Sequence, residues 1–301
     1  MSHVVHVEGL TKHYGSVIAL DDVSFSVTRN SIVGLLGRNG AGKTTLLQIL
    51  SAQGFETSGR VEVFGEHPYE NDRVLSQICF IKESQKYPDG FTVRHVLDAA
   101  RLMYRGWDDP FAQSLLADFD LPAGRGVKKL SRGMLSALGV IVGLASRAPL
   151  TFFDEPYLGL DAVARHLFYD RLLQDYADNP RTIVLSTHLI DEVADLLEHV
   201  LLIDRGRLVV DQDADSLRQR AVTVTGPSDN VARFTAAHEL LHREDLGTAF
   251  ARVTVAGTLE PGDRAKADEL GLGLEPVSLQ QLVVLTTGQS HRSHETSEES
   301  R

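Results

Sequence analysis

A glycine-rich loop near the start of the chain carries residue types that bind polyphosphates: Gly37-Arg38-Asn39-Gly40-Ala41-Gly42-Lys43-Thr44-Thr45. The apolar run Ile32–Leu36 precedes this loop, and the helix-like segment Leu46–Ala52 follows it. Glycines let the backbone turn its N–H groups toward an anion, and the start of the following helix adds its own unpaired N–H groups. Lys43 is then placed to reach the β- and γ-phosphates, and the Thr44 hydroxyl to hold Mg²⁺. The loop predicts a nucleoside triphosphate site, against the alternative of a flexible glycine turn.

Two adjacent carboxylates end a second apolar segment, Pro149–Pro156. Beside a phosphate site, Asp154 would hold Mg²⁺ through its water shell. Glu155 would orient or deprotonate the attacking water. The alternative is a polar strand end that caps the next turn.

A helix start follows at Leu130–Met134. Ser131 is a good N-cap, and Gly133 permits close backbone approach. This second helix N-terminus also suits an anion, although a serine before a helix is usually only a cap.

The order and spacing of five segments resemble the nucleotide-binding subunit of an ABC transporter over about residues 4–215. The separate-subunit exporter type is nearest, because Asp154-Glu155 continues as a proline and then Gly159-Leu160-Asp161. The resemblance implies an α/β P-loop NTPase fold of the ABC type with a helical subdomain. The segments are Gly37–Thr44, Leu130–Met134, Leu150–Glu155, Gly159–Asp161 and Ser186–His188.

The resemblance also implies roles for single residues. Tyr14 matches the aromatic that stacks on adenine, although it could instead fill a strand end. Ser131 and Gly133 match the signature motif that contacts the γ-phosphate bound to the opposite subunit. Asp161 matches the aspartate that crosses the dimer interface. His188 matches the switch histidine that bonds the γ-phosphate, in contrast to a structural histidine after a strand. The implied ATP-binding loop comprises Gly37, Asn39, Gly40, Ala41, Gly42, Lys43, Thr44 and Thr45.

Two positions depart from the family pattern. The glutamine loop should follow the strand Gln77–Ile81, where Glu83 stands, with Gln85 two residues later. Glu83 could still ligate Mg²⁺, and the choice between Glu83 and Gln85 stays open. Arg132 occupies a signature position where glycine is commonest. It could add a cation near phosphate or be a tolerated exposed side chain.

The elements that position these residues alternate between strands and helices. This alternation predicts a mostly parallel sheet covered on both faces. We expect a turn at Asp21-Asp22, and a helical insertion over about residues 92–146. Expected strands are His3–Glu8, Val23–Arg29, Ile32–Leu36, Arg60–Phe64, Gln77–Ile81, Leu150–Phe153, Thr182–Ser186, Val200–Ile203 and Arg207–Val210. Expected helices include Ala162–Tyr176 and Leu189–Leu197.

The pattern changes after about Arg220, which predicts an ATPase domain over 1–220 and a small α+β accessory domain over 221–290. Strands are expected there at Ala221–Thr225 and Ala251–Val255, with helices at Val231–Ala237, Arg264–Leu270 and Leu279–Leu285. The accessory domain could be regulatory, stabilise a dimer or be a variable extension. Residues 291–301 lack apolar anchors and are expected to be disordered, so His291 and His294 belong to a solvated tail rather than a metal site.

Composition narrows the class of partner. The formal net charge of −11 argues against a nucleic-acid-wrapping surface. The single cysteine, Cys79, excludes an internal disulfide and is expected to be a buried apolar side chain. No secretory signal and no apolar segment of about 20 residues is apparent, which predicts a cytoplasmic chain that meets the membrane through a partner.

The expected function is therefore ATP binding and hydrolysis with Mg²⁺ that powers a separate transmembrane permease, with export favoured. ATP would drive closure of a homodimer, or of a heterodimer with another ATPase subunit. The alternative is a soluble ABC-type ATPase acting on DNA or ribosomes. Such proteins need a coiled-coil insertion, zinc cysteines or two cassettes, none of which this sequence contains. A nucleotide sensor without hydrolysis would require loss of catalytic residues, yet Glu155 and His188 are both present.

Overall fold

The computed structural model describes residues 3–83, 85–258 and 261–284. The chain divides into two compact units. The first contains the residues up to Leu189 together with Leu196–Asp211, and the second contains Ile190–Asp195 and the residues from Gln212 onward.

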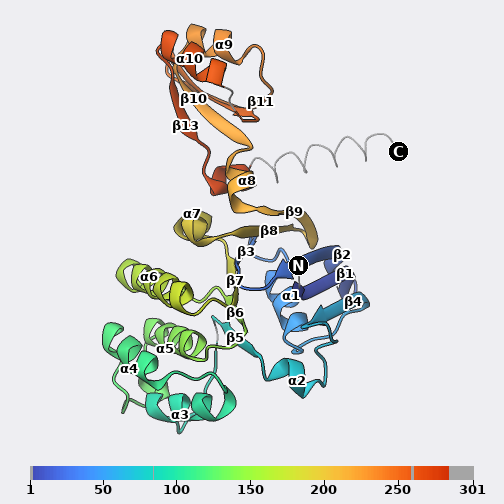
Figure 1. Ribbon diagram of the computed structural model, residues 1–301, viewed down its shortest axis with the longest axis vertical. Helices are drawn as coiled ribbons and strands as arrows, with labels where there is room; N and C mark the ends of the chain where they lie inside the picture. Colours follow the sequence, from blue (N-terminus) through green and yellow to red (C-terminus); the bar gives the residue numbers. More distant parts are fainter. Residues whose placement is uncertain (1–2, 84, 259–260, 285–301) are drawn as a thin grey trace. The chain divides into compact units, whose positions relative to one another are not determined.

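The centre of the first unit is a six-stranded sheet with a parallel core (Figure 1). β5, β6, β7, β3 and β8 pair in parallel, and β9 returns beside β8 through a tight turn at Arg205-Gly206. Every residue of β3, β6 and β7 is buried, as expected of strands covered on both faces. The strands, in sheet order, are β5 (Ile78–Lys82), β6 (Leu150–Asp154), β7 (Thr182–Thr187), β3 (Ile32–Leu36), β8 (His199–Asp204) and β9 (Arg207–Asp213).

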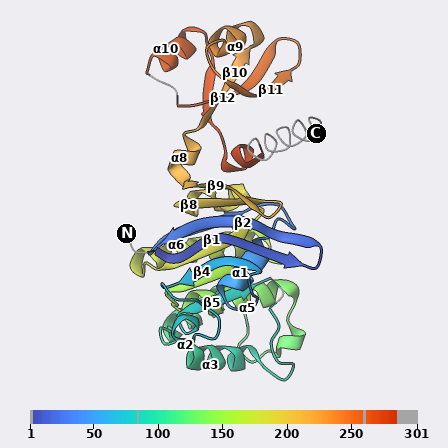
Figure 2. The same cartoon turned by 90° about the vertical axis from the view of Figure 1, so that its right-hand side faces the viewer.

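A second, antiparallel sheet of three strands faces the viewer in Figure 2. It contains β2 (Val17–Thr28), β1 (His3–Tyr14) and β4 (Ser58–Val63), in that order. The turn predicted at Asp21-Asp22 is wrong, because β2 continues through both residues while Asp22 takes a left-handed φ of 53° beside an irregular register with β1. The hairpin instead turns at Gly15, with Tyr14 paired to Val17.

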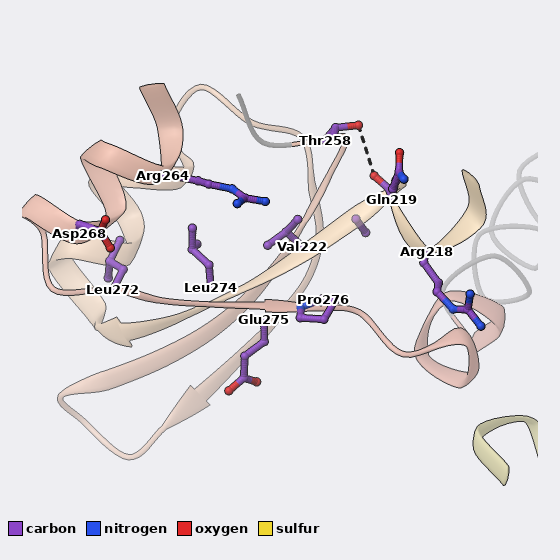
Figure 3. Close-up of a pocket in the computed structure, with 11 residues that line it drawn as sticks. Arg218, Gln219, Val222, Thr258, Arg264, Asp268, Leu272, Leu274, Glu275 and Pro276 are labelled. Atoms are coloured by element: carbon purple, nitrogen blue, oxygen red, sulfur yellow. Dashed lines mark hydrogen bonds between the residues drawn. The ribbon is translucent and has the colours of Figure 1, made fainter. Parts of the chain in front are cut away.

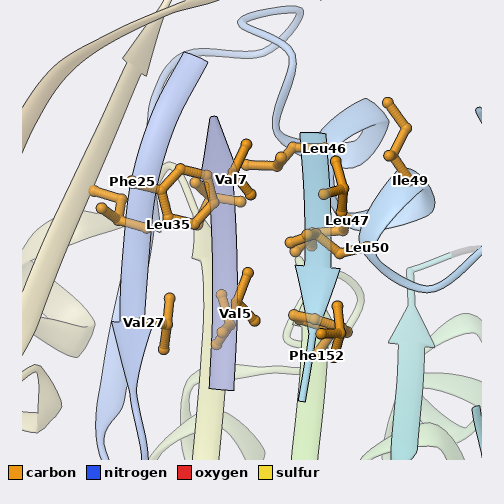
Figure 4. Packing of buried hydrophobic residues seen from close by; sticks show 14 of the residues in the cluster. Val5, Val7, Phe25, Val27, Leu35, Leu46, Leu47, Ile49, Leu50 and Phe152 are labelled. Carbon is orange, nitrogen blue, oxygen red and sulfur yellow. The ribbon is translucent and has the colours of Figure 1, made fainter. Parts of the chain in front are cut away.

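Helix α1 (Lys43–Leu50) packs between the two sheets. Its side chains Leu46, Leu47 and Leu50 belong to the same buried cluster as Val5, Val7, Phe25, Leu35 and Phe152 (Figure 4). Full burial of such a side chain is worth about 1.5–3 kcal/mol, so this cluster fixes the helix that follows the phosphate loop.

The other face of the parallel sheet is covered by helices, as Figure 1 shows for α5 and α6. The stretch 92–146 contains α3 (Val93–Met103), α4 (Asp109–Asp118), the 3-10 turn Val127–Lys129 and α5 (Arg132–Ala145), which confirms its helical character. α5 is buried from Ser136 to its end and passes close to Ile81 and Phe153 at two glycines. The remaining helices of the unit are α2 (Asp72–Leu75) and α6 (Ala162–Asp178).

The second unit contains a four-stranded antiparallel sheet with strand order β11-β12-β10-β13. The chain order β10-α9-β11-β12-α10-β13 with this sheet order is a ferredoxin-like arrangement of two split βαβ motifs. A separate apolar core, which includes Val224, Phe234 and Val253, lies between the sheet and its helices. The elements are β10 (Ala221–Pro227), α9 (Ser228–Thr235), β11 (Leu240–Leu246), β12 (Phe250–Ala256), α10 (Pro261–Glu269) and β13 (Gly273–Pro276).

Sequence patterning missed β11 and β13, and it overestimated the helix at Leu189–Leu197. That segment forms only the single turn α7 (Ile190–Val193) and a 3-10 turn at Ala194–Leu196. A short helix, α8 (Ala214–Arg218), precedes β10. The last expected helix is present over residues 279–284, while the predicted tail at 291–301, with His291 and His294, lies outside the described residues.

Cys79 is fully buried in β5, as predicted, and burial raises the pKa of its thiol. Among the described residues, no helix combines the length and the apolar character that crossing a bilayer requires.

Candidate active site at the phosphate loop

The loop between β3 and α1 can be formed only with glycine at two of its positions. A Cβ on Gly37 would lie 2.3 Å from the carbonyl oxygen of Ile203, and one on Gly42 would lie 2.6 Å from that of Ala19. Gly42 also has a φ of 112° and is the N-cap of α1, without a side chain to satisfy the first N–H groups of the helix. These N–H groups and the helix dipole therefore remain available to an anion.

Lys43 is held inside the loop that it follows. Its ammonium donates to the carbonyl oxygens of Gly37 at 2.8 Å and Arg38 at 3.3 Å, and it lies 3.3 Å from Oε1 of Glu155. The residue is only 5% exposed. A buried ammonium is stable only with such partners, so the contacts hold a positive charge at the centre of the loop.

Thr44, in the first turn of α1, is hydrogen-bonded to Asp154, the last residue of β6. The Thr44 hydroxyl donates to Oδ2 of Asp154 at 2.7 Å, while Oδ1 is buried and has no hydrogen-bond partner of good geometry among the described residues. Burial raises the pKa of the Asp154 carboxyl, and the bond from Thr44 opposes this shift. A hydroxyl beside a buried carboxylate with an unsatisfied oxygen is the donor set that Mg²⁺ prefers, so these residues fit that ion.

Glu155 is fixed through both its backbone and its carboxylate. Its N–H donates to the carbonyl of Ser186 at 3.1 Å, and its φ is +50°, which is uncommon for a residue with a side chain. Oε2 lies 2.8 Å from Nδ1 of His188 and also accepts a short hydrogen bond from the hydroxyl of Tyr157. Lys43, Glu155 and His188 therefore form one continuous chain of contacts.

The signature segment lies against the loop that joins β6 to α6. Ser131 caps α5 by accepting from the N–H of Met134 at 3.2 Å, as predicted. A Cβ on Gly133 would lie 2.6 Å from the carbonyl oxygen of Gly159, so Gly133 is required within the subunit as well. Ser136 adds a hydrogen bond of 2.6 Å to the carbonyl of Leu158.

The two departures from the family pattern contact each other. The guanidinium of Arg132 forms a close ion pair with Oε1 of Glu83; the Arg132 side chain is 68% exposed and the Glu83 side chain 38%. The N–H of Glu83 donates to the carbonyl of Asp154 at 3.0 Å, which fixes its backbone beside β6. Gln85 sits in the following turn, where its N–H donates to the carbonyl of Lys82 at 3.1 Å.

Two further predicted residues lie at the periphery. Tyr14 is the last residue of β1, and its side chain is 51% exposed, with the ammonium of Lys12 4.9 Å from its ring centroid. Its ring is therefore accessible to a ligand, and its match to the adenine-stacking aromatic stays a prediction. Asp161 is the N-cap of α6 and accepts from the N–H of Ala164 at 2.9 Å. No contact between described residues joins Ser131 or Asp161 to Lys43.

Sequence reasoning missed Tyr157. It is 2% exposed, and its hydroxyl meets Glu155, Thr187 and the N–H of His188. A tyrosine two residues after Glu155, the predicted base, was the available signal, but spacing alone does not tell whether its hydroxyl faces that carboxylate.

The second unit has a hollow of its own, of about 550 Å³ (Figure 3). Val222 and Leu274 form part of its apolar floor, and the guanidinium of Arg264 extends over it from α10. No residue of the phosphate loop lines this hollow.

The sequence and the fold of this chain are similar to those of known ATP-binding proteins. A family model described as "ABC transporter" matches residues 20–158. The bacitracin transport ATP-binding protein BcrA of Bacillus licheniformis is 32% identical over 73% of this chain and 73% of its own. The ABC transporter ATP-binding protein YtrB of Bacillus subtilis (strain 168) is 26% identical over 84% of this chain and 86% of its own. A solved structure of the ATP-binding subunit of an ABC transporter superposes with a TM-score of 0.65 at 26% identity, over 71% of this chain and 92% of that chain.

Proposed function

This chain belongs to the ABC transporter family of ATP-binding proteins, and from that premise we propose that it drives a permease on a separate chain. The observation that carries the proposal is the joined set Lys43–Glu155–His188 beside Thr44–Asp154, at the carboxyl ends of three parallel strands. This is where ligands bind in open α/β sheets.

The proposed roles follow from the contacts. The N–H groups of the loop and the Lys43 ammonium bind the β- and γ-phosphates of ATP. Glu155 accepts a proton from the attacking water, and His188 bonds the γ-phosphate. Thr44 and Asp154 would hold Mg²⁺, with Glu83 as a further candidate ligand, and the ion would neutralise charge on the phosphate oxygens.

We further propose that two ATPase subunits form the complete site. Ser131 and Gly133 would contact the γ-phosphate bound to the partner subunit, and Asp161 would cross the interface. Within the described part of one chain, no contact joins Ser131 or Asp161 to Lys43, which supports placing these two residues at the ATP site of the partner subunit. ATP then favours closure, because only the closed dimer supplies the second set of contacts.

The partner would be a membrane-spanning permease, and the chain would act at the cytoplasmic face of the membrane. Export is favoured, since the sequence resembles the separate-subunit exporter type. BcrA, a bacitracin transport ATP-binding protein, supports a role in transport. The alternative, an ABC-type ATPase on DNA or ribosomes, is not favoured by any of the relatives described above.

The substitution Glu155→Gln tests the proposal. It keeps the size of the side chain but removes the base, so kcat for ATP should fall by at least about 100-fold while ATP affinity stays within a few-fold. Size-exclusion chromatography with Mg-ATP should show accumulation of a dimer, because the γ-phosphate is no longer removed. The exposed Glu8→Gln on β1 serves as the control and should behave as wild type. Undiminished turnover in Glu155→Gln would remove Glu155 from its role.

A further inference from the structure

Tyr157 lies in the loop between β6 and α6, two residues after Glu155 and two before Gly159. Its ring is buried, with its centroid 6.2 Å from that of His188. We propose that Tyr157 is a positioning residue for hydrolysis: its phenol holds the Glu155 carboxylate and joins it to Thr187 and His188. This inference deepens the proposed function and rests on it.

The hydrogen bonds of the phenol can be assigned completely. A tyrosine hydroxyl has one proton to donate and accepts through its oxygen. Because Glu155 is a carboxylate beside Lys43, the phenol donates to Oε2 and then accepts from the Thr187 hydroxyl and from the His188 N–H at 3.3 Å. The Thr187 oxygen in turn accepts from the N–H of Leu189 at 2.8 Å. Every donor in this set therefore has one acceptor.

The direction of these hydrogen bonds determines which oxygen of the Glu155 carboxylate can accept a proton from a reactant. Oε2 is occupied by Tyr157 and by Nδ1 of His188. Oε1 is buried, and among the described residues it has the Lys43 ammonium at 3.3 Å but no hydrogen-bond donor of good geometry. The phenol therefore fixes the plane of the carboxylate and leaves Oε1 as the oxygen that can face a reactant. Phenylalanine would fill almost the same volume but could not supply this restraint.

Tyr157 also connects the catalytic carboxylate to the segment proposed to reach the partner subunit. The N–H of Leu160 donates to the carbonyl of Tyr157 at 2.9 Å, and Asp161 follows directly. On its other side, this loop is bonded to α5 through Ser136 and the carbonyl of Leu158 at 2.6 Å. A movement of α5, which carries Gly133 and Ser136, would thus shift Glu155 through these hydrogen bonds and the backbone between them.

The substitution Tyr157→Phe in the full-length chain tests the inference. We expect kcat for ATP to fall roughly tenfold, the effect of losing about 1.4 kcal/mol of transition-state stabilisation. The KM for ATP and the affinity for a fluorescent ATP analogue should stay within about twofold, because no phosphate contact is removed. Tyr176→Phe is the matched control: its hydroxyl donates to the Asn30 carbonyl at 2.7 Å, outside the site, so its loss should leave kcat unchanged.

A double-mutant cycle separates positioning from packing. If Tyr157 acts through Glu155, then adding Tyr157→Phe to Glu155→Gln should not lower the single-turnover rate further. The ATP-dependent dimer of Glu155→Gln should also persist in the double variant. A further tenfold fall of the single-turnover rate in the double variant would show that Tyr157 acts independently of Glu155, and would overturn the inference. A wild-type kcat in Tyr157→Phe would overturn it as well.

Thr187→Val provides a second variant in case Tyr157→Phe fails to fold. It removes one donor to the phenol and leaves Tyr157 in place, so kcat should fall by a few-fold at unchanged KM, and an unchanged kcat would overturn the inference. The two proposals can fail separately. Wild-type turnover in Glu155→Gln would refute the role proposed for Glu155, whereas loss of turnover there with normal turnover in Tyr157→Phe would refute only the role of Tyr157.

Discussion

Gly133 illustrates how a single residue in this protein is constrained from within its own subunit. Its missing Cβ leaves room for the carbonyl oxygen of Gly159, and the opposing atom belongs to the backbone, so it cannot rotate away. The close approach places the start of α5 directly against the loop that begins at Glu155. Gly133 is therefore required for packing within its own subunit, in addition to the contact proposed with the γ-phosphate on the partner subunit.

Gly133→Ala should therefore destabilise the protein although alanine is the better helix former. The new Cβ would lie 2.6 Å from a backbone oxygen, and overpacking of this kind costs about 1–3 kcal/mol, against a gain in helix propensity of about 1 kcal/mol. We expect a net loss of about 1 kcal/mol in the free energy of unfolding, measured by urea denaturation, together with a lower kcat. Gly124→Ala, whose Cβ would meet nothing within 4 Å, should change stability by less than about 0.5 kcal/mol. Equal effects of the two substitutions would contradict this account.

Local spacing predicted which residues would lie together around the phosphate loop, while their roles stay predictions. Lys43, Thr44 and Asp154 lie where the phosphate-loop pattern and the apolar strand before Asp154 place them, and their contacts agree with that pattern. The Tyr157–Glu155 bond and the Arg132–Glu83 pair could not be predicted in this way. Each depends on side-chain direction, and the second also on two segments about 50 residues apart meeting in space.

At the scale of elements, the Arg132–Glu83 pair joins the first residue of α5 to the loop after β5. By the resemblance described above, both positions depart from the family pattern, and the two side chains carry opposite charges. An exposed pair of this kind adds only about 0–1 kcal/mol to stability. Its consequence is therefore expected in nucleotide binding, because Glu83 lies beside the backbone of Asp154.

Arg132→Gly should leave the Glu83 carboxylate unpaired near the phosphate site and raise the KM for ATP by roughly fivefold, which corresponds to about 1 kcal/mol. If Glu83 acts only through its unpaired charge, adding Glu83→Gln should return the KM to within about twofold of wild type; if Glu83 also ligates Mg²⁺, the KM should stay raised. Steady-state ATPase assays on both single variants and the double variant measure this coupling. Asp89→Asn, which breaks the exposed pair of Asp89 with Lys128 at 2.8 Å, is the matched control and should leave the KM unchanged. Additive effects of Arg132→Gly and Glu83→Gln would refute the coupling.

Elements with strong apolar patterns were predicted closely, and polar or irregular ones were not. The buried strand Ile32–Leu36 matches its prediction at both ends, since an apolar run bounded by a polar turn and a glycine loop has few alternatives. β11 was missed because it is an exposed edge strand with the charged sequence His242–Asp245, and β13 because its four residues include glycine and proline. The predicted turn at Asp21-Asp22 failed because a strand irregularity absorbs the left-handed residue.

At the scale of the whole chain, the described residues form more than one apolar core. One cluster joins the two sheets of the first unit around α1, and another lies inside the ferredoxin-like unit. A fully buried phenylalanine lies in each unit, Phe168 against Phe153 in the first and Phe234 in the core of the second. Because the cores are separate, we expect that one unit can be destabilised without the other. This is also what two domains divided near residue 220 would show.

Phe234→Ala should destabilise only the second unit. Truncation of a buried phenylalanine costs about 3–5 kcal/mol, and in a unit of this size that is a large part of its total stability. Hydrogen exchange followed by mass spectrometry should then show faster exchange in β10, β12 and α9, while β3, β6 and β7 keep their protection and ATP hydrolysis continues. Phe168→Ala is the matched variant and should give the reverse pattern, with loss of protection in β6 and α6 and impaired hydrolysis. If Phe234→Ala instead accelerates exchange in β3, β6 and β7 to the same extent, the two cores unfold as one cooperative unit, and the accessory unit contributes directly to the stability of the ATP site.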